Sequence, residues 1–393
     1  GQDSTFAGTV SAGTSTDSNG KGNFKYAPPA GFLAVCTANL PDPVETIDPN
    51  EGGSPQDYFN TVLYTGNGTT QDITGVGFQP DWLWIKRRSA VEHHLLTDSV
   101  RGVTKSLNSN RTAAEATRTD QVTAFGADGF SLGDDGAGYS GIDGQTYASW
   151  NWKAGTAFSN DESATGVGSI DSSGSVNTDV GFSIISYTGN GSNGATVAHG
   201  LGVSPDMIIA KTRDSAENWQ IFHSALGGTK RLYFLTNAEV DTAEAWNDTN
   251  PSATVITLGT SDLINKNTDE YIAYCFASVD GYSKFGSYTG NGNADGTFVY
   301  TGFRPAFVLI KSTSAVESWN LFDTARDPSN LTTQNLNPNV SNAESDASSG
   351  ARAIDILSNG FKPRGDNSAV NNDGGNFIYM AFAEQPFKYA NAR

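Results

Sequence analysis

The chain has 393 residues and carries 42 acidic against 24 basic side chains, which gives a formal net charge of −18. That acidity argues against a nucleic-acid binder, which needs basic patches, and against docking on anionic lipid. Charged residues are scarce at 17%, glycine is abundant at 44 residues, and aromatic residues make up 11%. The composition therefore favours many short strands joined by turns over helices, and it excludes a disordered chain.

The first fifty residues differ from the rest of the sequence. Small and polar residues alternate over 1–25, Ala34–Leu40 predicts a short strand, and Pro41–Gly53 indicates a linker. A segment of this length is too short to bury a hydrophobic core of its own. We therefore expect residues 1–50 to be the last strands of a β-sandwich followed by a linker.

One pentapeptide, Tyr-Thr-Gly-Asn-Gly, occurs three times in the chain, at Tyr64–Gly68, Tyr187–Gly191 and Tyr288–Gly292. Each copy is followed by a glycine–proline step, an apolar run of four residues and a lysine. Each ends on a further aromatic strand, at Tyr147–Trp150, Tyr271–Tyr274 and Phe377–Met380. Landmarks that recur in the same order indicate an internal repeat.

The repeat predicts the domain organisation. We name residues 51–156 repeat 1, 180–282 repeat 2 and 283–393 repeat 3, with a Ser/Gly-rich linker at 157–179. Each unit is long enough to hold its own core, so we expect beads along a line, with repeats 2 and 3 packed together. Short strands separated by turn residues predict an all-β chain of tandem β-sandwich domains. Asn-Gly in each pentapeptide predicts a type I′ turn with positive φ at both residues.

Several motifs carry a resemblance to a known family. The pentapeptide, the Gly-Phe-x-Pro-Asp step with its lysine, Asp98–Gly102 and Ala381–Phe387 resemble a repeat of tailed-phage structural proteins. Pro28–Phe32 and Cys36–Pro41 are similar to the end of a SPRY-like domain. The resemblance implies concanavalin-like jelly-roll domains, three copies plus the end of a fourth, in a tail fibre or receptor-binding protein.

The same resemblance implies partners and a location. We expect a protein of the virion surface that is made in the host cytoplasm. Its partners would be copies of itself, with a trimer as the first candidate, other virion proteins and a host-surface glycan, without nucleic acid or membrane insertion.

Residues for catalysis are hard to find in this sequence. The chain has four histidines and no Gly-x-Ser-x-Gly elbow, and its acids are too numerous for any pair to stand out. We therefore expect no enzyme, no catalytic residue, no metal and no cofactor. Calcium at the loops Asp134–Gly136 and Asn371–Asn376 is the alternative, against which we favour simple turns. Cys36 and Cys275 are expected to be buried free thiols.

Loop residues provide the candidate binding contacts. Tyr139 lies in a Gly-rich loop and Trp246 in a polar stretch, and both are expected to be exposed. Asn371, Asn372 and Asp373 offer groups that suit saccharide hydroxyls, in a loop of the kind that commonly carries binding residues. Trp219 and Trp319, by contrast, are expected to occupy equivalent buried positions.

Three rival functions stay open beside receptor binding. A purely structural or decorating virion protein would use the repeats for assembly only. A glycan depolymerase would cleave the polysaccharide that it binds, and a secreted bacterial adhesin is compatible with the same composition.

Overall fold

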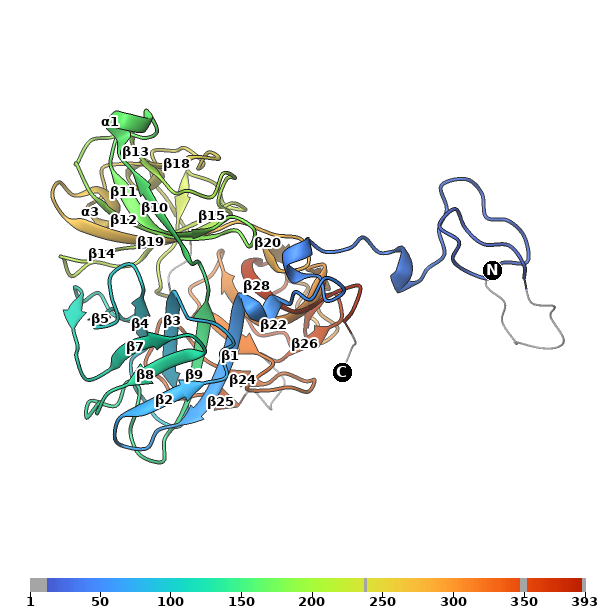
Figure 1. The fold of residues 1–393 in the computed structure, drawn as a ribbon, viewed down its shortest axis with the longest axis horizontal. Helices are drawn as coiled ribbons and strands as arrows, with labels where there is room; N and C mark the ends of the chain where they lie inside the picture. Colours follow the sequence, from blue (N-terminus) through green and yellow to red (C-terminus); the bar gives the residue numbers. More distant parts are fainter. Residues whose placement is uncertain (1–12, 237–238, 347–351, 391–393) are drawn as a thin grey trace.

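The computed structural model describes residues 13–236, 239–346 and 352–390 and shows an antiparallel all-β protein (Figure 1). The predicted all-β class is therefore confirmed. Helices are single turns: α1 (Glu162–Thr165), α2 (Ala243–Trp246), α3 (Asp262–Asn265) and the 3-10 turns η1 (Thr37–Asn39), η2 (Glu45–Ile47) and η3 (Pro55–Asp57). Over the described ranges, none of these helices has the length and apolarity needed to cross a membrane.

One strand order recurs in three large sheets. The strand of the pentapeptide pairs with the closing strand, the closing strand with the lysine strand, and the lysine strand with a short aromatic strand. These strands are β1 (Phe59–Thr65), β9 (Thr146–Trp152), β3 (Trp82–Arg87) and β4 (Leu95–Asp98) in repeat 1; β12 (Phe182–Thr188), β19 (Glu270–Phe276), β14 (Met207–Thr212) and β15 (Gln220–His223) in repeat 2; and β20 (Ser283–Thr289), β28 (Asn376–Pro386), β22 (Phe303–Ser312) and β23 (Asn320–Asp323) in repeat 3.

Smaller sheets accompany each large one. Repeat 1 has β2 (Gln71–Thr74) with β8 (Gly129–Leu132) and β7 (Val122–Gly126), and β5 (Lys105–Ser106) with β6 (Ala116–Thr117). Repeat 2 has β13 (Ala195–Ala198) with β18 (Val255–Leu258), and β16 (Lys230–Arg231) with β17 (Val240–Asp241). Repeat 3 has β21 (Val299–Tyr300) with β27 (Gly360–Pro363) and β26 (Ile354–Leu357), and β24 (Gln334–Asn335) with β25 (Ser345–Asp346). A separate apolar core lies within each repeat.

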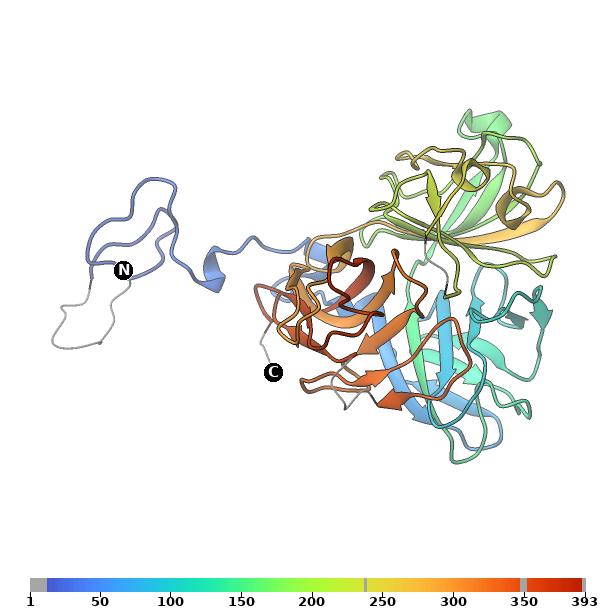
Figure 2. The ribbon, with the colours of Figure 1, turned by 180° about the vertical axis from the view of Figure 1, so that it is seen from behind.

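A fourth apolar core joins the three repeats. In β3, Leu83 and Ile85 point into the core of repeat 1, whereas Trp82 and Trp84 belong to a cluster that draws on all three large sheets. The lysine strands β14 and β22 alternate in the same way. Successive side chains of a strand point to opposite faces, so each large sheet packs on both sides. The predicted beads along a line are therefore wrong: the repeats surround one central core (Figures 1 and 2).

Equivalent hydrogen bonds close the three repeats into a ring. The Trp219 indole of repeat 2 donates to the Asn108 carbonyl of repeat 1 at 2.9 Å, and the Trp319 indole of repeat 3 donates to the Tyr233 carbonyl of repeat 2 at 2.8 Å. The third contact joins His94 Nε2 of repeat 1 to the Asn337 carbonyl of repeat 3 at 3.1 Å. Trp219 and Trp319 are each 1% exposed, which confirms their predicted burial.

The predicted linker at 157–179 is part of a sheet. β10 (Thr156–Asn160) and β11 (Ser172–Asn177) extend the large sheet of repeat 2 to six strands. The small side chains that suggested a linker permit this pairing: a Cβ at Gly174 would lie 1.8 Å from the Ile184 carbonyl oxygen, and the Ser172 hydroxyl donates to the Ala198 carbonyl. Serine and glycine were therefore misleading as signs of a flexible segment.

Two expectations for the first fifty residues also differ from the structure. Ala34–Leu40 holds the 3-10 turn η1 instead of a strand, and the Asp17 carboxylate, not a neighbouring strand, accepts the Ala34 N–H. Within the expected linker Pro41–Gly53, Ile47 is fully buried in the central core. Residues 44–53 therefore form a strap that seals the ring, and residues 13–40 extend away from it (Figure 1).

Candidate functional site

The pentapeptide loops are structural clamps. Gly292 N–H donates to the Asn371 carbonyl at 3.0 Å, and Gly191 N–H donates likewise to the carbonyl of Asn265. The Asn371 side chain is fully buried, accepts the Asn291 N–H at 3.0 Å and donates to two backbone carbonyls. Since Asn265 is bonded in the same way in repeat 2, Asn371 is a loop anchor and its predicted role as a binding contact is wrong.

The Asn-Gly pairs do not form the expected type I′ turn. Gly68, Gly191 and Gly292 have φ of 71°, 68° and 60°, but the asparagines before them do not belong to the described non-glycine residues with positive φ. Each of these asparagines instead accepts the N–H two residues further on, as Asn67 Oδ1 does from Thr69 at 2.9 Å. This side-chain bond replaces the backbone turn.

The other predicted binding residues lie in different repeats. Trp246 is 1% exposed because the short helix α2 turns its indole onto Phe222, so its predicted exposure is wrong. Tyr139 is half-buried, with its ring stacked on His93 at a centroid distance of 6.1 Å. Asn372 and Asp373 are exposed. No hydrogen bond or ring contact between described residues joins these three places into one site.

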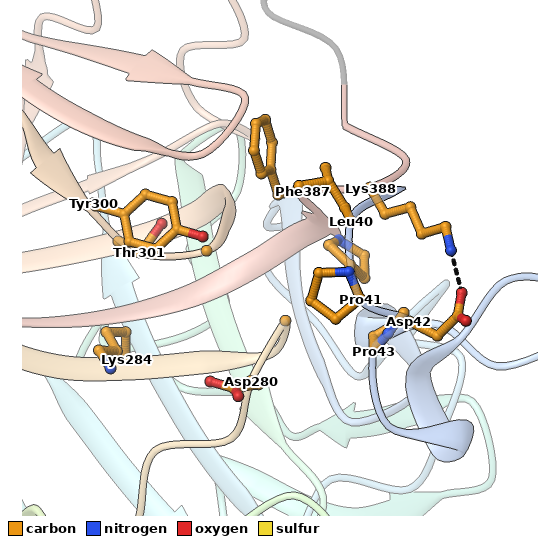
Figure 3. A pocket seen from close by; sticks show the side chains of 13 residues that line it. Leu40, Pro41, Asp42, Pro43, Asp280, Lys284, Tyr300, Thr301, Phe387 and Lys388 are labelled. Carbon is orange, nitrogen blue, oxygen red and sulfur yellow. Dashed lines mark hydrogen bonds and ion pairs between the residues drawn. The ribbon is translucent and has the colours of Figure 1, made fainter. Parts of the chain in front are cut away.

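A hollow of 320 Å³ lies where residues 40–43 and the C-terminal residues Pro386, Phe387 and Lys388 meet the strands of repeat 3 (Figure 3). We call it the terminal hollow. Tyr300 and Phe387 lie on one side of it, Asp280 and Lys284 on the opposite side, and Pro41 along a third side. Its complete lining is Leu40, Pro41, Asp42, Pro43, Asp280, Gly281, Lys284, Tyr300, Thr301, Gly302, Pro386, Phe387 and Lys388.

Two charged groups of the terminal hollow have no protein partner. Neither Asp280 nor Lys284 makes a side-chain hydrogen bond or an ion pair with any residue that the structure describes. Lys388, in contrast, is paired with Asp42 at the rim. The hollow therefore offers one free carboxylate and one free ammonium group beside exposed aromatic surface.

The repeats provide an internal control for the terminal hollow. In repeat 1, Thr74 pairs with Gly129 at the start of β8, and Tyr300 takes the same place in repeat 3, opposite Gly360 at the start of β27. Its side chain is 57% exposed. The fold thus does not require an aromatic residue there. The repeats differ in length between this strand and the proline, so the equivalence of Thr74 and Tyr300 is visible only in the strand pairing. The proximity of Pro41 and Lys284 likewise depends on tertiary structure.

Buried titratable groups serve the structure. Burial lowers the pKa of His223 to about 4, and its two ring nitrogens bond the Tyr379 carbonyl and the Ala225 N–H. Burial also lowers the pKa of each repeat's lysine, Lys86, Lys211 and Lys311, to about 8. Each lysine donates to backbone carbonyls. These residues are fully engaged in holding strands and loops.

Metal ligands do not gather in the described part of the chain. No group of three His, Cys, Asp or Glu side chains there could hold a metal ion. At the predicted calcium loop Asp134–Gly136, both oxygens of Asp135 accept bonds from the loop itself, from Ala137 and Ser140. Cys36 and Cys275 are free thiols; Cys275 is buried as predicted and Cys36 is half-buried.

The sequence matches one known family over residues 54–386, a domain of unknown function (DUF7483), and the chain belongs to that family. The match runs through all three large sheets and the central core between them. A search of curated proteins finds no match, and a search of solved structures finds none either.

Proposed function

We propose that this chain is a non-enzymatic appendage protein of a phage virion, in which a rigid ring presents loops and hollows for recognition of a host-surface glycan. The observation that carries this proposal is the terminal hollow, where an exposed Tyr300 and two unpartnered charged groups meet on well-packed strands. Polar and aromatic groups without a structural task, placed on a rigid scaffold, are typical of a binding surface.

The finer architecture belongs to the same proposal. We infer three β-sandwich copies of jelly-roll type, preceded by the end of a SPRY-like domain within residues 1–50. Trp219, Trp319 and His94 each form a hydrogen bond from one repeat to another within the same chain. In a trimer of single repeats, the equivalent contacts would join separate chains. A homo-oligomer would therefore use surfaces outside this ring.

A second candidate is an assembly protein of the virion. It is favoured by apolar side chains exposed in the extended N-terminal segment, where Tyr26 is 76%, Phe32 is 68% and Val35 is 96% exposed. Contiguous apolar patches on a protein surface commonly mark contacts with another protein. The two functions are compatible if this segment attaches the ring to the particle.

Binding and cleavage assays test the proposed function together. The purified chain is applied to an array of bacterial surface glycans, and each bound glycan is then assayed for released reducing ends. We expect binding without release. Release of reducing ends would show a depolymerase, and a folded chain that binds neither glycans nor cells would overturn recognition in favour of the assembly function.

A further inference from the structure

We propose that the terminal hollow binds the end of a neutral glycan, with a hexopyranose ring lying against Tyr300. This inference rests on the proposed recognition function and names the site and the ligand class. The other candidates in the molecule are weaker: Asn371 and Trp246 are buried, and the three lysines and His223 are engaged with backbone carbonyls.

The aromatic side of the hollow suits a sugar ring. Tyr300 exposes 57% of its surface, and Phe387 lies on the same side of the hollow (Figure 3). The C–H face of a pyranose is apolar and packs against an aromatic face, while the sugar hydroxyls point outward to polar groups. Because Thr74 fills the place of Tyr300 in repeat 1, the fold does not require this aromatic surface.

The polar side of the hollow indicates a neutral ligand. The Asp280 carboxylate accepts hydrogen bonds and the Lys284 ammonium donates them, so sugar hydroxyls, which both donate and accept, suit these two groups. Asp42 and Lys388 neutralise each other at the rim, and Asp280 balances Lys284. With a formal net charge of −18 on the whole chain, an anionic sugar would in addition be repelled at long range.

The wall of the hollow is held in place before any ligand arrives. Asp48 accepts the Tyr389 hydroxyl at 2.9 Å, and this bond joins the strap to the C-terminal residues. Gly281 has φ of 79°, and a Cβ there would lie 3.1 Å from Pro43. A hollow built from fixed segments loses little entropy on binding. Its volume of 320 Å³ lies at the small end of ligand sites, as one or two sugar rings require.

Calorimetry and ligand-observed NMR with methyl hexopyranosides test the proposal. The probes are the methyl glycosides of glucose, galactose and mannose, with glucuronic acid as the charged comparison, at low and high salt. We expect at least one neutral glycoside to bind, with an affinity that changes little with salt. Tyr300→Ala and Asp280→Asn should each weaken it about three- to tenfold. Tyr233→Ala, which removes a half-buried tyrosine outside the hollow, is the matched control and should leave the affinity unchanged.

Four results would overturn the inference. They are no binding of any neutral glycoside, equal binding by the Tyr300→Ala protein, equal loss in the Tyr233→Ala control, and tighter salt-sensitive binding of glucuronic acid. If the wild-type chain binds glycans or cells and Tyr300→Ala binds them equally, the site is wrong while the proposed function stands.

Discussion

Removing one partner of the ion pair between Asp98 and Arg101 should destabilise the ring strongly. Their side chains are fully buried and 2.6 Å apart, and the Tyr274 hydroxyl of repeat 2 donates to the same Asp98 oxygen at 2.7 Å. Arg101 also reaches Glu115 at 3.1 Å. Arg101→Leu leaves a buried carboxylate without its cation, and such a loss costs about 3–5 kcal/mol.

Repeat 2 shows how the same position works without charge. In repeat 2, His223 and Leu226 take the places of Asp98 and Arg101. The strand of repeat 3 that faces them has Met380 at the position of Tyr274, and a methionine side chain has no hydrogen to donate. The three residues change together. This agreement suggests a set of contacts that can be exchanged as a unit.

The triple variant Asp98→His, Arg101→Leu, Tyr274→Met should therefore recover most of the stability that Arg101→Leu loses. Glu115 keeps Arg213 at 2.9 Å, so no carboxylate is stranded. Urea unfolding followed by tryptophan fluorescence measures both free energies. A single variant that loses less than about 1 kcal/mol, or a triple variant no more stable than the single one, would refute the reasoning.

Three further predictions concern stability, each read from urea midpoints. In the folded protein the pKa values of Lys86, Lys211 and Lys311 are about 8, below the ordinary 10.5. Above pH 8 the unfolded chain therefore binds more protons at these lysines than the folded chain does. The free energy of unfolding should then rise by about 1 kcal/mol per lysine between pH 8 and 9. Lys311→Met should remove a third of this rise. Burial raises the pKa of Cys275 to about 12, so this thiol opposes the rise only from about pH 9. A stability that does not change between pH 8 and 9 would contradict the burial of the lysines. Gly290→Ala places a Cβ 2.3 Å from a carbonyl oxygen and should cost more than about 1 kcal/mol, whereas Gly136→Ala meets nothing and should be neutral; equal effects would disprove the clamp. Ile47→Ala should lower the free energy of unfolding by about 2–5 kcal/mol if the strap packs on the central core. A smaller loss would show that the strap does not contribute to the stability of the core.

The sequence predicts what depends on local pattern. The apolar runs before Lys86, Lys211 and Lys311 form strands buried on both faces because every side chain in them is hydrophobic. The burial of Trp219 follows from its place in an aromatic strand step. All-β class and short strands follow from glycine, serine and threonine joined to aromatic residues.

What failed depends on contacts distant in the chain. A strand buried on both faces requires a second layer, but the sequence does not say that this layer is another repeat. Trp246 lies in a polar stretch, and only the turn of α2 directs it inward. In the sequence, Asn371 resembles a ligand-binding residue. In the structure its side-chain amide donates to backbone carbonyls of the same repeat. The terminal hollow unites Pro41 with Lys284, which no local pattern brings together.

The most direct test of recognition by this ring is a comparison of the wild-type and Tyr300→Ala chains on one array of bacterial surface glycans. Tyr300 is exposed and Thr74 fills its place in repeat 1, so the substitution should leave folding intact, as equal urea midpoints would show. The account predicts that the wild-type chain binds one or more neutral glycans and that Tyr300→Ala binds them several-fold more weakly. A folded wild-type chain that binds no glycan would contradict it.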